Sequence, residues 1–164
     1  MYDLQHELID ALKSTPEILQ GLLSQVTVEQ AKSTKGGLEN WSITEVVCHL
    51  RDTEEISFQR MQAMRDHDHP TIPTYDQEVL ARERKYREAD LYEALNAFIA
   101  FRERHVAALS TLSTEEWERT GKHTEFGRIT IFGHTLHKVS HDAIHCAQIA
   151  RQLLALRTTD QSQE

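Results

Sequence analysis

Apolar residues recur at every third or fourth position along four long stretches of the chain, which is the spacing of one face of an α-helix. The stretches span residues 3–26, 42–66, 91–109 and 130–156. Within the first, Thr15-Pro16 indicates either the start of a second helix or a kink in one continuous helix. Four helices of this length predict an all-α chain that folds as a four-helix bundle.

Capping signals mark where two of the predicted helices begin. Ser42 and Glu45 have the S-x-x-E spacing of a capping box, and Trp41 is placed to act as a hydrophobic staple before it. The same spacing in residues 113–116 predicts a short helical turn that contains Trp117. Both capping signals are independent of the spacing of apolar residues, and the signal at Ser42 places the start of a helix where that spacing also begins.

Two segments lack a clear period. Residues 67–85 contain Pro70 and Pro73, and a connection of this length indicates a crossover between helices rather than a plain up-down arrangement. The same segment is long enough to cover the mouth of a site. Residues 119–128 are polar, and we expect them to be irregular.

A row of histidines runs along the last predicted helix. His134, His137, His141 and His145 follow one another at spacings of three, four and four residues, and Gln148 continues the row. Positions with these spacings share one face of an α-helix. A parallel apolar stripe is expected to face the core, and its members are Phe132, Leu136, Val139, Ala143, Ala147, Ala150 and Leu154. We therefore expect the histidines beside that core, toward the bundle interior or its edge.

Metal binding explains such a row, because two histidines one helical turn apart can bind the same zinc, nickel, copper or iron ion. A third ligand must come from another helix, and His49, midway along the 42–66 helix, is the best candidate. Glu45 and Asp52 lie one turn either side of His49 and are predicted to orient the ligands. Asp52 is also a candidate base toward a bound water. The alternative is that the interior histidines hydrogen-bond to one another and hold no metal.

The net charge, the apolar runs and the cysteines of the chain exclude some classes of function. The formal net charge of −8 opposes binding to a phosphate backbone, so nucleic acid is not an expected partner. No apolar run approaches the ~18 residues of a membrane span, so no membrane role is expected. Cys48 and Cys146 form no disulfide framework, and we expect two small core residues in a reducing, cytoplasmic protein. The remaining histidines are expected at the surface or in loops: His6, His67, His69, His105 and His123.

Two segments carry a resemblance to a known family. The segment Trp41–Asp52, WSITEVVCHLRD, resembles the W-S-x-x-E-x-x-x-H-L-x-D segment of the DinB-like (DinB/YfiT) superfamily of proposed metalloenzymes. The segment His137–Ile149, HKVSHDAIHCAQI, resembles the closing helix of that family, H-x-x-x-H-x-x-x-H-x-x-Q-I. The resemblance covers nearly the whole chain and implies one domain over 1–164, a bundle with a down-up-up-down arrangement and a long crossover connection.

The resemblance also implies the site and its chemistry. It implies one divalent metal ion (Zn, Ni or Fe) held by His49, His141 and His145. His137 lies outside that triad and, with Glu45 and Gln148, is expected in the second shell or the pocket lining. Because three neutral histidines leave a coordination position open, the ion can hold a water or a thiol.

The family's assigned activities are mostly thiol transfer. We therefore expect a thiol S-transferase that acts on small electrophiles, with a low-molecular-weight thiol as a cofactor and a small molecule as substrate. The alternatives are a metal-dependent hydrolase that uses metal-bound water, and a non-enzymatic stress protein that binds a metal or small ligand. A homodimer fits a bundle of this size, although no interface shows in the sequence.

Overall fold

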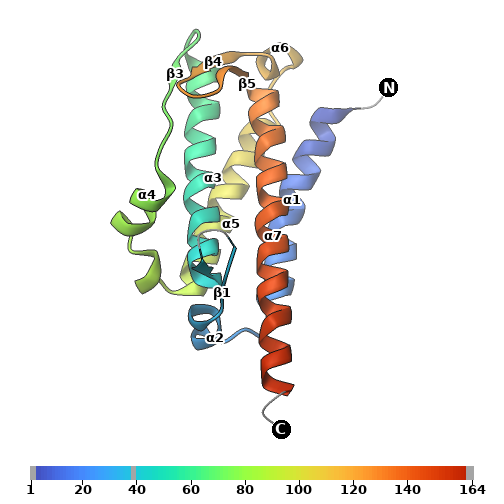
Figure 1. Cartoon of the computed structure of the whole chain (residues 1–164). Coiled ribbons are helices and arrows are strands. Elements are labelled where there is room, and N and C mark those ends of the chain that lie inside the picture. The colour runs from blue at the N-terminus through green and yellow to red at the C-terminus, as the bar shows by residue number, and fades with distance from the viewer. Residues whose placement is uncertain (1–2, 38–39, 162–164) are drawn as a thin grey trace.

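The described residues, 3–37 and 40–161, are dominated by four long helices that run down, up, up and down along one axis (Figure 1). These are α1 (Leu4–Leu23), α3 (Ile43–Asp66), α5 (Leu91–Leu109) and α7 (Ile131–Gln161). Because α3 and α5 run in the same direction, a crossover joins them. The computed structural model thus confirms the predicted four-helix bundle with a crossover. The domain predicted over 1–164 extends past the described residues at both ends.

Helix α1 passes through Pro16 without interruption. Of the two alternatives predicted for residues 3–26, the structure therefore has the single continuous helix. Proline has no backbone N–H, so it leaves the carbonyl four residues earlier, that of Leu12, without its helical partner. Arg102 of α5 supplies the missing donor, with its Nη1 at 2.7 Å from that carbonyl oxygen. The proline therefore creates a contact point between α1 and α5.

The predicted capping box opens α3. The Ser42 hydroxyl accepts a hydrogen bond from the Glu45 amide at 3.2 Å, and the Glu45 carboxylate accepts one from the Ser42 amide at 2.8 Å. Before it, the six-residue helix α2 (Val28–Ser33) and a small antiparallel pair, β1 (Lys35–Gly36) and β2 (Trp41–Ser42), connect α1 to α3. Trp41 is buried there, at the foot of α3.

The crossover between α3 and α5 contains short elements rather than an irregular loop. They are β3 (Thr71–Ile72), α4 (Gln77–Glu83) and a 3-10 turn, η1 (Tyr86–Glu88). Asp52 of α3 holds this segment, because its buried carboxylate accepts hydrogen bonds from the Tyr86 hydroxyl at 2.7 Å and from Arg84 at 3.0 Å.

A small sheet closes the upper end of the bundle in Figure 1. After the predicted turn around Trp117, α6 (Thr114–Trp117), the strands β4 (Thr120–His123) and β5 (Gly127–Thr130) form an antiparallel hairpin, and β3 pairs with β4 in parallel. The expectation that residues 119–128 are irregular was wrong. Gly127, at φ +73, closes the hairpin, and Gly121 leaves space that Ile72 fills.

The interior of α7 also differs from the prediction. The expected apolar stripe faces outward in part, with Leu136 51% and Leu154 60% exposed. The buried face is instead largely polar: His134, Thr135, Lys138, Asp142, His145, Gln148 and Gln152. Side chains of α3 and α5 and backbone carbonyls pair with many of these groups, so the periodicity of α7 alone did not reveal which face is inside.

The buried apolar residues form two clusters. One includes Leu19 of α1, Leu50 of α3 and Phe98 of α5, and the other includes Leu12 of α1, Met61 of α3 and Trp117 of α6. In the described part of the chain, no helix combines the length and the apolar character needed to cross a membrane.

Candidate metal centre

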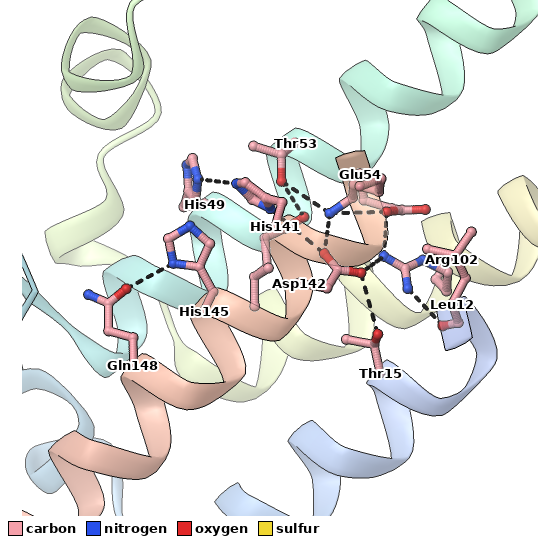
Figure 2. A network of polar contacts seen from close by, with 12 residues as sticks. Leu12, Thr15, His49, Thr53, Glu54, Arg102, His141, Asp142, His145 and Gln148 are labelled. Atoms are coloured by element: carbon pink, nitrogen blue, oxygen red, sulfur yellow. Dashed lines mark hydrogen bonds and ion pairs between the residues drawn. The ribbon is translucent and has the colours of Figure 1, made fainter. Parts of the chain in front are cut away.

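Three predicted ligands meet between α3 and α7. One ring nitrogen from each of His49, His141 and His145 lies within 4.8 Å of the others. The Nε2 atoms of His49 and His141 are 2.9 Å apart, and the ring centroids of His141 and His145 are 4.5 Å apart (Figure 2). The structure therefore brings together the two α7 histidines and the α3 histidine that the sequence selected.

Local sequence explains this convergence. His141 and His145 are one turn apart on α7, so their rings project from the same face. His49 lies on the second turn of α3, whose start is fixed by the Ser42 capping box, and its ring centroid is 5.0 Å from that of buried Trp41. Packing of α3 against the antiparallel α7 then places all three rings at one level.

Gln148 fixes the orientation of His145. The Nδ1 of His145 is 2.8 Å from the Oε1 of Gln148, and the Nε2 of Gln148 donates to the Gly36 carbonyl oxygen at 3.1 Å. Since an amide oxygen can only accept, His145 carries its ring proton on Nδ1 and a lone pair on Nε2. This is the arrangement that orients a metal-binding histidine, and it places Gln148 where the sequence analysis expected it.

The rings of His49 and His141 are neutral at physiological pH. Burial, with the nearby His141 and His145, lowers the pKa of His49 to about 2. Burial likewise lowers the pKa of His141 to about 4. Neutral imidazole is the form that binds a metal ion.

The hydrogen-bonding capacity of this cluster is not used up within the protein. The Nδ1 atoms of both His49 and His141 are buried and have no hydrogen-bond partner. Asp142 Oδ1 approaches His141 Nδ1 only to 3.8 Å, which is too long for a hydrogen bond. One ring nitrogen from each of three histidines lies within 4.8 Å of the others, and this convergence fits a divalent metal ion.

The two predicted carboxylates have other contacts. Asp52 is paired with Arg51 at 2.7 Å as well as with Arg84 and Tyr86. Glu45 caps α3 and pairs with Arg87 at 3.2 Å. Both side chains therefore hold the fold around the site, and the roles predicted for them toward the histidines and a bound water stay predictions.

The remaining expected neighbours are close to the histidines but outside their cluster. His137 is exposed, and its ring centroid is 6.3 Å from that of His141. Cys48 is buried and Cys146 half-buried, and both thiols are free. Burial raises the pKa of each thiol to about 11, so both stay protonated at neutral pH.

A second polar cluster, which sequence reasoning missed, lies beside the histidines (Figure 2). We call it the ionic cluster, and it consists of Glu54, Arg102, His105, Lys138 and Asp142. One Arg102 nitrogen is 2.6 Å from both Glu54 and Asp142, and Lys138 is 2.5 Å from Asp142. Although burial raises the pKa of Glu54 and of Asp142, the nearby cations hold both pKa values well below their usual range. Lys138 and Asp142, at i and i+4 on one helix, were the only signal available in the sequence.

Two histidines expected at the surface are in fact buried. His105 is 1% exposed, and its Nδ1 is 2.8 Å from Glu54 Oε1. His123 is 4% exposed, and its Nδ1 accepts from the amides of Glu125 and Phe126. His105 contacts a carboxylate of another helix, although its Nε2 has no partner, and His123 is bonded by the backbone of the hairpin turn. Neither contact follows from the apolar period, which is why the sequence alone did not place these histidines.

Comparisons with known proteins show the family and the fold. The model of the DinB superfamily matches residues 11–149. A protein of Oceanobacillus iheyensis, provisionally named a metal-dependent hydrolase, is 27% identical over 128 residues, which cover 77% of this chain and 72% of that protein.

Two solved structures share the fold. YfiT from Bacillus subtilis, described as a probable metal-dependent hydrolase with an unusual four-helix bundle topology, matches with a TM-score of 0.86 and 24% identity over 93% of this chain and 87% of that one. The mycothiol-dependent maleylpyruvate isomerase matches with a TM-score of 0.70 and 11% identity over 88% of this chain and 60% of that one. With the family model matched over most of its length, this chain belongs to the DinB superfamily.

Proposed function

We propose that His49, His141 and His145 hold one divalent metal ion, zinc, nickel or iron. The supporting observation is the convergence of one ring nitrogen from each of the three histidines, two of which, His49 and His141, are neutral at physiological pH. An ion held by three histidines keeps an open position, where it lowers the pKa of a bound water or thiol. Gln148 keeps the His145 lone pair directed for binding.

We further propose that the protein is a thiol S-transferase acting on small electrophiles. A hydrolase that uses metal-bound water generally relies on a nearby group as general base. The carboxylates within one turn of a histidine ligand are all paired with cations: Glu45 with Arg87, Asp52 with Arg51 and Arg84, and Asp142 with Lys138 and Arg102. A thiol bound to a metal ion needs no such base, because coordination itself favours the thiolate.

The proposed reaction is a substitution at carbon. The thiol gives up its proton to solvent, its sulfur forms a bond to the electrophilic carbon, and the leaving group departs with the bonding electron pair. His141 is the half-buried member of the triad and neighbours exposed His137, and we propose that a small molecule approaches the histidines from this side. A structural neighbour named for its dependence on mycothiol is consistent with thiol chemistry in this fold.

Metal-dependent hydrolysis is the second candidate. It is favoured by the names of two relatives, the Oceanobacillus protein and YfiT, which both describe metal-dependent hydrolases. The same three histidines serve both candidates, so the site residues alone do not separate them. A protein that binds a metal without catalysis is the third outcome that the experiment below distinguishes.

The test compares thiol transfer and hydrolysis on the metal-reconstituted protein. Chlorodinitrobenzene is offered with cysteine, glutathione or coenzyme A, and nitrophenyl esters and anilides are offered without thiol. We expect thiol-dependent formation of the dinitrophenyl thioether, which His145→Ala reduces to the uncatalysed rate. His67→Ala, which removes an exposed histidine at the end of α3, is the matched control and should retain activity.

The alternative outcomes are equally clear. Ester or anilide turnover without thiol, lost in His145→Ala, would replace the transferase by a hydrolase. Bound metal without turnover in either assay would contradict both enzymatic proposals and leave a metal-binding protein.

A further inference from the structure

A cavity of about 340 Å³ lies beside the candidate metal centre, on the side of the small sheet. It is lined by Arg60 of α3, His123 of β4, Phe126 and Ile129 of the hairpin, and His134 and His137 of α7. A cavity of this size suits a small organic molecule. Its apolar wall is formed by Phe126, stacked on His123 with ring centroids 4.7 Å apart, and by Ile129.

The charge in this cavity comes from one cation. Arg60 is half-buried and donates to the Pro73 carbonyl oxygen at 2.6 Å, and its guanidinium lies over the Tyr75 ring. Among the residues that the structure describes, no carboxylate pairs with Arg60 and none lines the cavity. In a chain of net charge −8, a half-buried arginine without an acidic partner is a position where an external anion is expected to bind.

The histidines add uncharged hydrogen-bonding groups. His134 is only 7% exposed, and its Nε2 is buried without a hydrogen-bond partner. His123 accepts two backbone N–H groups at Nδ1, so its ring proton is on Nε2. An unpartnered buried nitrogen is costly unless a ligand or water completes it.

From these contacts we propose that this cavity binds the carboxylate group of a small, partly apolar organic substrate. Arg60 pairs with the carboxylate, and the wall of Phe126 and Ile129 receives the apolar part. His137 lines the cavity, and its ring centroid is 6.3 Å from that of His141, so the cavity lies next to the histidine cluster. The assignment to a substrate rests on the proposed function, whereas the anion site itself does not.

The test measures binding of benzoate and of benzamide, its uncharged counterpart, by NMR titration of the full chain, once with metal and once after chelation. We expect benzoate to bind in both states and benzamide to bind much more weakly. Arg60→Gln should weaken benzoate binding by about 10-fold or more, the effect of losing a charge-assisted hydrogen bond, and Arg60→Lys should restore part of it. Arg128→Gln, which removes an exposed arginine from the same hairpin, is the matched control and should bind as the wild type does.

Each outcome separates the anion site from the metal. Benzoate binding that disappears on chelation or in His145→Ala would place the carboxylate on the metal and overturn the proposal. Equal binding of benzoate and benzamide, or equal effects of Arg60→Gln and Arg128→Gln in variants of unchanged melting temperature, would also overturn it. Failure to find a metal or an activity would leave the benzoate result standing.

Discussion

Two polar clusters lie side by side inside the bundle, and they differ in whether they contain paired charges (Figure 2). The ionic cluster balances Glu54 and Asp142 against Arg102 and Lys138 through contacts of 2.5 to 3.4 Å. The histidine cluster contains no charge and leaves buried nitrogens of His49 and His141 without partners. Both clusters keep buried nitrogens without a partner, Nε of Arg102 and Nε2 of His105 in the first and Nδ1 of His49 and of His141 in the second. The clusters differ because the charges of the first are paired with one another, whereas the second brings three ring nitrogens together where a ligand can bind.

The comparison predicts different consequences for removing a member of each cluster. Loss of a member of the ionic cluster leaves a buried charge uncompensated and destabilises the metal-free protein. Loss of a histidine leaves no charge behind and mainly affects metal binding. The predictions below test this division, from the largest effect to the smallest.

Arg102→Met should lower the free energy of unfolding by about 3–5 kcal/mol, the typical cost of breaking a buried ion pair. The variant leaves two carboxylates facing one lysine and also removes the donor to the Leu12 carbonyl that Pro16 exposes. Urea unfolding of the chelated protein measures the change. Arg104→Met, an exposed arginine on the same helix, is the control, and an equal loss there would contradict the account.

Gln148→Ala should weaken metal binding by about 10–100-fold, because it removes the group that orients His145. Gln152→Ala is the matched control, since that side chain is equally buried one turn further along α7 but bonds to the carbonyls of Thr34 and Trp41. Competition with a chromogenic chelator measures both affinities. If both variants bind metal equally, Gln148 acts only through the fold.

Acid should destabilise the protein through Glu54. Although burial raises the pKa of this carboxyl, Lys138 and Arg102 hold it well below its ordinary value of 4.5, so the unfolded chain binds the proton first. The stabilisation is therefore fully present above about pH 4.5 and is lost as the pH falls below it. Glu54→Gln should reduce the slope of the unfolding free energy against pH by at most about 1.4 kcal/mol per pH unit. An unchanged slope in urea titrations between pH 3 and 6 would contradict this role.

Thr15→Val should have the smallest effect. Its hydroxyl lies 3.4 Å from Asp142 Oδ2, a long hydrogen bond, and we expect a loss of about 0.5–1 kcal/mol. Ser14→Ala, whose exposed hydroxyl bonds within α1, serves as the control in thermal unfolding. A loss of unfolding free energy as large as that of Arg102→Met would contradict this prediction, because it would mean that the ion pairs of the cluster depend on the Thr15 hydroxyl.

The fold was predictable because its signals are local. The capping box at Ser42, the turn around Trp117 and the long crossover all follow from neighbouring residues, and each is present in the structure. The strands at residues 120–130 were missed because they are mostly polar, so the local hairpin of β4 and β5 shows no alternation of apolar residues. The pairing of β4 with β3 was missed because β3 lies about fifty residues earlier in the chain. The apolar period of α7 predicted the wrong buried face, because the face that is buried in the structure consists largely of polar residues.

The site was predictable only where its chemistry repeats along one helix. The spacing of His141 and His145 along one helix identified them as candidate ligands. His49 was then chosen because a third ligand has to come from a second helix. Arg102 and Glu54 carry no such pattern, because their partners come from four different helices, and any charged residue on a helix resembles a solvated one in sequence. Likewise, the sequence gives no sign that Arg60 and His134 belong to one site, because only the folded chain brings them to the same cavity.

The central claim is that the histidine cluster holds a metal ion, and the most direct test is the metal content of untagged protein by mass spectrometry. Wild type is compared with His49→Ala, His145→Ala and the surface control His67→Ala. We predict near-stoichiometric metal in the wild type and the control, and its loss in both cluster variants with little change in the stability of the chelated protein. Wild-type protein that takes up neither zinc nor nickel after both are added to the metal-free form would contradict the account.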